Sequence, residues 1–234
     1  MPDRKPDAHS DAPDHRGHRE RLRRRFLKGG DEALADYELL ELLLFQASPR
    51  RDVKPLAKRL LKEFGGFAEA VSAAPDDLRR VDGLGEAGLA ALKTVQAAAL
   101  RLARSQVMDK PVIASWQKLL DYLQASLAHE KAERFRLLFL DRRNRLIADE
   151  LQQTGTVDHT PLYTREVVKR ALELGASALI LVHNHPSGDP TPSKADIEMT
   201  REVRSAAEKL GISVHDHVVI GKGAYASFKA LGLL

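Results

Sequence analysis

The sequence predicts two units of different fold class: an N-terminal all-α helical domain, and a C-terminal α/β domain with a central β-sheet flanked by helices. Between residues 16 and 105, apolar side chains recur at helical spacing and no segment looks like a strand. Between residues 112 and 234, apolar strands alternate with amphipathic helices, which is typical of layered α/β domains. A chain of 234 residues is long enough for two such domains.

The N-terminal half begins with a polar tail. Residues 1–15 are rich in Asp, Pro and His, and we expect them to be disordered. Apolar side chains at helical spacing then predict helices over 36–45 and 57–64, the second ended by two glycines. Residues 76–104 predict a helix, a tight turn and an Ala-rich helix. The helical pattern is lost at 106–111, where we expect a linker.

In the C-terminal half, the spacing of apolar residues changes from a purely helical pattern to alternating strand and helix patterns. It predicts, in order, strands over 134–140 and 145–152 joined as a hairpin, a helix over 164–174, a buried strand over 178–182, a helix over 194–210, and short strands over 212–214 and 218–220.

Composition excludes several classes of protein. The chain has no cysteine, so disulfides, thiol nucleophiles and Cys-built metal sites are excluded. No apolar segment approaches the roughly 18 residues that span a bilayer, and the first residues lack the apolar core of a secretory signal. We therefore expect a cytoplasmic protein without a membrane partner. A net charge of +4 is only mildly basic.

The segment from His183 to Asp196 carries the clearest chemistry. His183 and His185 end an apolar strand, and residues two apart in a strand point to the same side. A loop rich in Pro and Gly follows, then Ser193 and Asp196 at the start of a helix. Taken separately, the histidines could be polar edge residues and the Ser–Asp pair a helix cap. Together, two histidines and one carboxylate favour an open catalytic zinc site, with one Zn²⁺ per chain and water as the fourth ligand.

This segment resembles a known family. The pattern His-x-His-x7-Ser-x2-Asp is similar to the JAMM motif of the JAB1/MPN metallopeptidases, and HNHPSGDPTPS with a later DHVVIG resembles the bacterial RadC family. The resemblance extends into the helical half. It implies a JAB1/MPN-like fold for residues 112–234 and a zinc-dependent peptidase or isopeptidase-like hydrolase, with a peptide or isopeptide as substrate.

The resemblance also implies roles for individual residues. His183, His185 and Asp196 match the zinc ligands, and Ser193 matches the serine that stabilises the oxyanion. An upstream glutamate should be the general base, and Glu150 fits because it precedes a Gly-Thr pair. If Asp196 binds zinc, we expect that it cannot also close a capping box with Ser193. For His217 we expect a structural or supporting role rather than ligation.

Two features of the helical half are candidates for DNA contact. The turn Gly83-Leu84-Gly85 between two helices resembles the helix–hairpin–helix module, although the acidic Asp82 and Glu86 beside it would repel phosphate. Residues Arg16–Lys28 hold seven basic side chains against Glu20 alone, which suits a phosphate track or a solvated helix face. The alternative function is therefore a DNA-associated repair or replication protein whose metal domain is subordinate or inactive. A nuclease is a weaker third alternative, because the motif offers few carboxylates.

Overall fold

The computed structural model describes residues 15–154 and 162–234, so the predicted disordered tail lies outside the described residues except for His15, which begins the first helix. Contacts divide the chain into two compact units, Met1–Thr94 and Val95–Leu234. The division falls inside the long helix α6 (Glu86–Ser105). Residues 106–111, the predicted linker, belong to the second unit by this division. Two hydrogen bonds join this segment to the start of strand β2 (Leu146–Thr154). The Leu146 N–H donates to the Lys110 carbonyl, and the Asp109 N–H donates to the Leu146 carbonyl.

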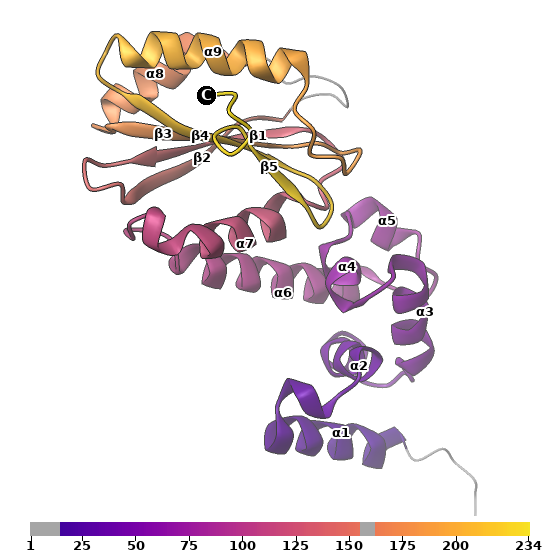
Figure 1. The fold of residues 1–234 in the computed structure, drawn as a ribbon. Helices are drawn as coiled ribbons and strands as arrows, with labels where there is room; N and C mark the ends of the chain where they lie inside the picture. Colours follow the sequence, from indigo (N-terminus) through magenta and orange to yellow (C-terminus); the bar gives the residue numbers. More distant parts are fainter. Residues whose placement is uncertain (1–14, 155–161) are drawn as a thin grey trace, which may run out of the picture. The chain divides into compact units, whose positions relative to one another are not determined.

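The described part of the first unit is helical, as predicted (Figure 1). Its elements are α1 (His15–Gly29), the short 3-10 helix η1 (Asp31–Ala33), α2 (Asp36–Ala47), α3 (Lys54–Phe64), α4 (Phe67–Ser72), α5 (Pro75–Arg79) and the beginning of α6. Gly65 ends α3 with a φ of 101°, a backbone conformation that suits glycine.

Part of the basic segment Arg16–Lys28 packs α1 against α2. The Arg19 guanidinium donates to three main-chain carbonyls after α2 and lies 4.5 Å from the ring centroid of Phe45. Arg25 donates to both carboxylate oxygens of Glu38, at 2.8 and 3.0 Å. These two arginines therefore have structural partners within the unit.

The second unit contains a five-stranded mixed sheet with the order β2-β1-β3-β4-β5. Its elements are the 3-10 helix η2 (Ile113–Ser115), α7 (Trp116–Leu127), β1 (Arg134–Leu140), β2 (Leu146–Thr154), α8 (Thr164–Glu173), β3 (Ala178–Asn184), α9 (Lys194–Glu208), β4 (Ser213–Ile220) and β5 (Tyr225–Ser227). Among these five described strands, β3 and β4 alone pair in parallel, and α9 connects them.

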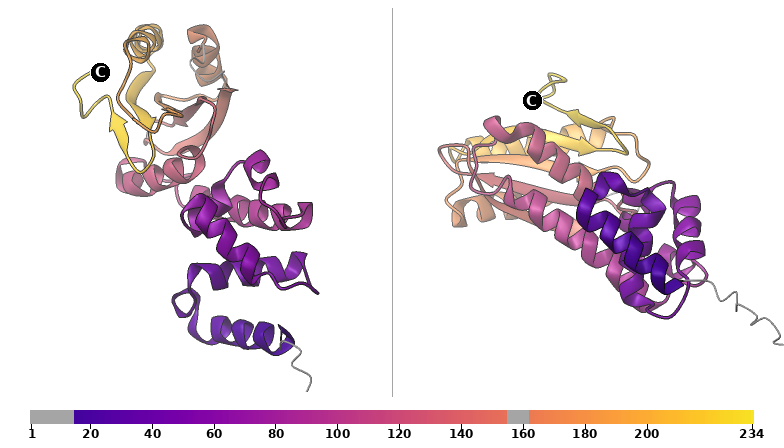
Figure 2. Two further views of the ribbon diagram at one scale, coloured as in Figure 1. Left: turned by 90° about the vertical axis from the view of Figure 1, so that its right-hand side faces the viewer. Right: turned by 90° about the horizontal axis from the view of Figure 1, so that it is seen from below.

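Helices cover both faces of this sheet. Figure 1 shows α8 and α9 on one side of it and α7 on the other, and the turned views in Figure 2 show the same layers. Along β3, Leu179 and Leu181 pack toward α8 and α9, whereas Ile180 and Val182 pack toward α7. All seven residues of β3 are buried, as expected for a central strand covered on both faces.

Three elements differ from the sequence expectation. The prediction of two short strands at 212–214 and 218–220 was wrong, because β4 runs unbroken through Asp216 and His217. Both side chains are buried and hydrogen-bonded, so the polar pair does not interrupt the strand. Helix α7 and strand β5 were not predicted. No helix in the described ranges combines the length and hydropathy needed to cross a bilayer.

Candidate metal centre

The end of β3 and the loop after it are fixed against β4. The His185 N–H donates to the Ile220 carbonyl at 3.0 Å, and the Lys222 N–H donates to the Gly188 carbonyl at 3.0 Å. Gly221 lies so close to this loop that a Cβ atom added to it would meet the Gly188 carbonyl oxygen and lie 2.9 Å from Pro190 Cδ. The backbone of the Pro- and Gly-rich loop therefore approaches position 221, directly after β4, so closely that only glycine fits there.

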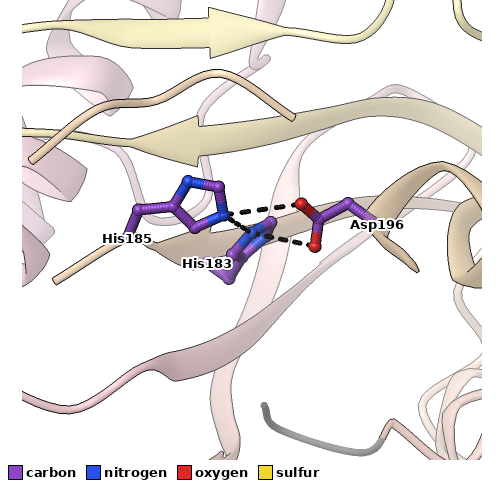
Figure 3. Close-up of side chains that lie close together, drawn as sticks. All are labelled: His183, His185 and Asp196. Atoms are coloured by element: carbon purple, nitrogen blue, oxygen red, sulfur yellow. Dashed lines mark hydrogen bonds and ion pairs between the residues drawn. The ribbon is translucent and has the colours of Figure 1, made fainter. Parts of the chain in front are cut away.

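Three predicted ligands converge at this end of the sheet (Figure 3). His183 Nε2 lies 3.0 Å from His185 Nε2 and 3.2 Å from Asp196 Oδ1, and His185 Nε2 lies 3.4 Å from Asp196 Oδ2. His183 is fully buried, whereas the side chains of His185 and Asp196 remain 19% and 12% exposed. Such a group could bind a metal ion, and among the described residues no other histidine or acid joins it.

Asp196 has a second role in the same geometry. Its Oδ2 accepts a hydrogen bond from the Ser193 N–H at 2.7 Å, and Ser193 Oγ accepts one from the Asp196 N–H at 3.1 Å. This reciprocal capping box begins α9. The expectation that Asp196 cannot both bind zinc and close a capping box stays a prediction, but the carboxylate already caps α9 while facing both imidazoles, and its lone pairs suffice for both.

Each imidazole is oriented by its other nitrogen. His185 Nδ1 lies 2.8 Å from the main-chain carbonyl oxygen of Asp189. His183 Nδ1 lies 2.8 Å from His217 Nε2, and the His183 ring stacks parallel to Phe135 with centroids 5.7 Å apart. His217 thus supports His183 and is not one of the converging residues. Sequence reasoning missed Thr200, whose hydroxyl contacts His217; its position four residues after Asp196 was the available signal.

Charge and burial compete at this site. Burial by itself would raise the pKa of Asp196, but hydrogen bonds to His183 and His185 outweigh it and lower that pKa far below its usual range. The hydrogen bond to Asp196 raises the pKa of His185, against the opposing effect of burial. Complete burial lowers the pKa of His217 well below its ordinary value, which keeps that ring neutral at neutral pH.

Glu150 does not join the converging residues. Glu150 on β2 pairs with Leu137 of β1, whereas His183 on β3 pairs with Phe135, two residues before Leu137 in β1. Arg170 of α8 donates to both oxygens of Glu150, at 2.7 and 2.9 Å, and these hydrogen bonds lower the pKa of Glu150. Its neighbour Asp149 points to the opposite face of the sheet, as predicted, where Tyr122 of α7 donates to it.

The Gly83 turn joins α5 to α6 with a φ of 86° at Gly83. The two acidic side chains beside it are paired. Arg59 donates to Asp82 Oδ2 at 2.8 Å, and Arg79 donates to Glu86 Oε1 at 2.9 Å. Their negative charges are therefore partly neutralised, which weakens the objection that they would repel phosphate.

A mixed sheet flanked by helices, with a His-His-Asp group at the end of its central strand, is consistent with a domain of the JAB/MPN class. Residues 113–233 match the family described as "RadC-like JAB domain", and residues 15–90 match "UPF0758 N-terminal". The chain belongs to the RadC family. It is 65% identical over 213 residues to a UPF0758 protein of Rhodobacter capsulatus, covering 91% of this chain and 100% of that one. A UPF0758 protein of Ruegeria pomeroyi is 58% identical over 219 residues, or 94% and 98% of the two chains.

Proposed function

We propose that the second unit is a zinc-dependent metallohydrolase of the peptidase or isopeptidase type. One observation carries the proposal. A main-chain carbonyl can only accept, so the Asp189 oxygen takes the Nδ1–H of His185, and a neutral His185 then presents a lone pair at Nε2. That lone pair faces a carboxylate at 3.4 Å and a second imidazole nitrogen at 3.0 Å. Electron-rich groups this close need a shared proton or a metal cation among them, and a metal ion would bind all three at once.

The donor set fits zinc. Two imidazole nitrogens and one carboxylate oxygen are ligands that zinc prefers, and three protein ligands are typical of catalytic rather than structural zinc sites. His185 and Asp196 are partly exposed, so the group is open to solvent on one side. Bound by these residues, zinc would supply Lewis acidity that polarises a scissile carbonyl and lowers the pKa of water to about 7.

The remaining roles belong to Ser193 and Glu150. Ser193 is exposed, and because its Oγ accepts the Asp196 N–H, its own hydroxyl proton can be donated to a developing oxyanion. Glu150 is our predicted proton carrier between water and a leaving amine. Arg170 holds its carboxylate, so Glu150 must leave this partner before it can take up a proton near the His-His-Asp group.

Elemental analysis of the purified full-length chain tests the proposal. Wild-type protein should carry about one zinc per chain, and His183→Ala or His185→Ala should remove it. His129→Ala is the matched control, because His129 is exposed and outside the group. Zinc retained by both ligand variants would contradict the proposed site. Loss of zinc from His129→Ala as well would show that the metal binds elsewhere.

A DNA-associated role of the first unit is the second candidate. It rests on the Gly83 turn, whose acidic neighbours are paired with arginines, and on the exposed side chains of Arg23, Arg24 and Lys28. Binding of the full chain to a labelled DNA duplex should weaken as salt rises, and neutralising these three side chains with glutamine should reduce that salt dependence. Absence of binding at about 50 mM salt would argue against this role.

A further inference from the structure

We propose that Thr200 and His217 determine which nitrogen of His183 carries its proton, and so prepare His183 Nε2 as a metal ligand. The inference rests on the proposed metal site. Thr200 Oγ1 lies 2.5 Å from the main-chain oxygen of Asp196 and 2.7 Å from His217 Nδ1. His217 Nε2 lies 2.8 Å from His183 Nδ1. We call this series of bonds the Thr200–His217 chain.

The donor in each hydrogen bond of the Thr200–His217 chain can be deduced by starting from the Asp196 carbonyl oxygen. The Asp196 carbonyl oxygen has no proton, so the Thr200 hydroxyl must donate to it. Thr200 Oγ1 then accepts from His217, which places the proton of neutral His217 on Nδ1. His217 Nε2 is left as an acceptor, so His183 must donate from Nδ1. A neutral His183 therefore keeps a lone pair on Nε2, the atom that faces His185 and Asp196.

The surroundings prevent water from replacing any of these bonds. His183 and His217 are fully buried, and Thr200 is 1% exposed. Phe135 stacks on His183, and Phe228 stacks on His217 with centroids 4.4 Å apart. In such a dry interior an unpaired N–H is unfavourable, so the directions are strongly preferred. His185 differs, because its proton is fixed directly by a carbonyl and its side chain is partly exposed.

The chain also connects two of the proposed ligands. Asp196 presents its carboxylate to the imidazoles and its main-chain carbonyl to Thr200, one helical turn along α9. Replacing Thr200 with valine keeps the shape but removes the oxygen. His217 Nδ1–H would then lack an acceptor, so His217 should move its proton to Nε2 and donate to His183 Nδ1. That change places the proton of His183 on Nε2, where zinc would have to displace it.

Nitrogen-15 NMR of the metal-free full-length chain tests this directly, about two pH units above the ordinary imidazole pKa. We expect His183 and His217 both protonated at Nδ1 in wild type and in Thr200→Ser, and both protonated at Nε2 in Thr200→Val. Thr94→Val is the matched control, since the Thr94 hydroxyl makes the same helical bond to the Ala90 carbonyl, far along the sequence in α6. A wild-type His183 protonated at Nε2, or a Thr200→Val protein with unchanged tautomers, would overturn the inference.

Zinc affinity, measured by competition with a chelator, gives the second readout. Thr200→Val should bind zinc about 10- to 100-fold more weakly, the range typical for lost partners of metal-binding histidines, and Thr200→Ser and Thr94→Val should stay near wild type. Equal affinities in Thr200→Val and wild type would overturn the inference. Absence of zinc binding by wild type would instead contradict the proposed function, while the tautomer measurement would still test the chain. If Thr200→Val does not fold, the wild-type tautomers of His183 and His217 decide the question alone.

Discussion

Ser193 and Asp196 hydrogen-bond reciprocally at the start of α9, while Asp196 also faces the imidazoles of His183 and His185. Oδ2 of Asp196 accepts the Ser193 N–H at 2.7 Å, and Oδ1 lies 3.2 Å from His183 Nε2. The same carboxylate therefore fixes the helix end and completes the candidate metal site. Substitutions at the two positions should separate these roles.

Asp196→Asn keeps an acceptor for the Ser193 N–H but loses the negative charge. We expect zinc affinity to fall by more than about 100-fold, beyond the range for outer partners, while the hydrogen bond that caps α9 is kept. Ser193→Ala removes the cap and should lower the free energy of unfolding by about 0.5–2 kcal/mol, while about one zinc per chain is retained. Zinc titration and denaturant unfolding of both variants distinguish the roles, and the reverse pattern would contradict the assignment.

Gly221→Ala should displace the loop that carries Asp189. The added Cβ would meet the Gly188 carbonyl oxygen, which already accepts the Lys222 N–H, so neither backbone can easily give way. We expect a loss of about 1–3 kcal/mol in the free energy of unfolding and weaker zinc binding. Gly85→Ala is the control, because a Cβ there meets nothing within 4 Å. Two equally stable variants with unchanged zinc affinity would show that the close approach is unimportant.

The buried carboxylate of Asp149 should be important for stability and unimportant for metal binding. It accepts from Tyr122 Oη at 2.6 Å and from two nitrogens of Arg136. Burial, aided by the charge of Asp149, raises the pKa of Tyr122, so the phenol stays protonated and donates. Asp149→Ala should lower the free energy of unfolding by about 3–5 kcal/mol, and Tyr122→Phe by about 1 kcal/mol. Both should retain zinc. A destabilisation below about 1 kcal/mol for Asp149→Ala would count against this view.

The ion pair of Glu150 and Arg170 should produce a pH-dependent stability difference. Hydrogen bonds from Arg170 lower the pKa of Glu150 from its ordinary value of 4.5. The pair therefore stabilises the fold fully above that value, and the effect is lost as pH falls through the lowered pKa. Both side chains are partly exposed, so wild type should exceed Glu150→Gln by about 1 kcal/mol at most near neutral pH, with the gap closing below about pH 4.5. A gap that is constant with pH would contradict this pairing.

The ligand group could be predicted because it is local in sequence. A strand end, a Pro- and Gly-rich loop and a helix start bring His183, His185 and Asp196 within fourteen residues of one another, so their shared pattern is visible in the sequence even though contacts with β4 then fix the loop. Glu150 is different, since its position depends on the register of β2 with β1 and on Arg170 from α8. Neither can be deduced from spacing along the chain.

The continuity of β4 could not be predicted for a similar reason. Asp216 and His217 resemble a polar break between two short strands. In the fold, Ser227 donates to Asp216, and Thr200 and His183 contact His217, so both polar side chains are satisfied by partners distant in sequence. The helical character of the first half and the alternation of strands and helices in the second were predictable from periodicity alone.

The most direct test of the metal site is a crystal structure of the zinc-loaded protein with anomalous data at the zinc edge. We predict one anomalous peak per chain, about 2.0–2.1 Å from Nε2 of His183 and of His185 and about 2.0–2.2 Å from a carboxylate oxygen of Asp196. A peak that lacks either imidazole, or zinc bound only elsewhere on the chain, would contradict the proposed function.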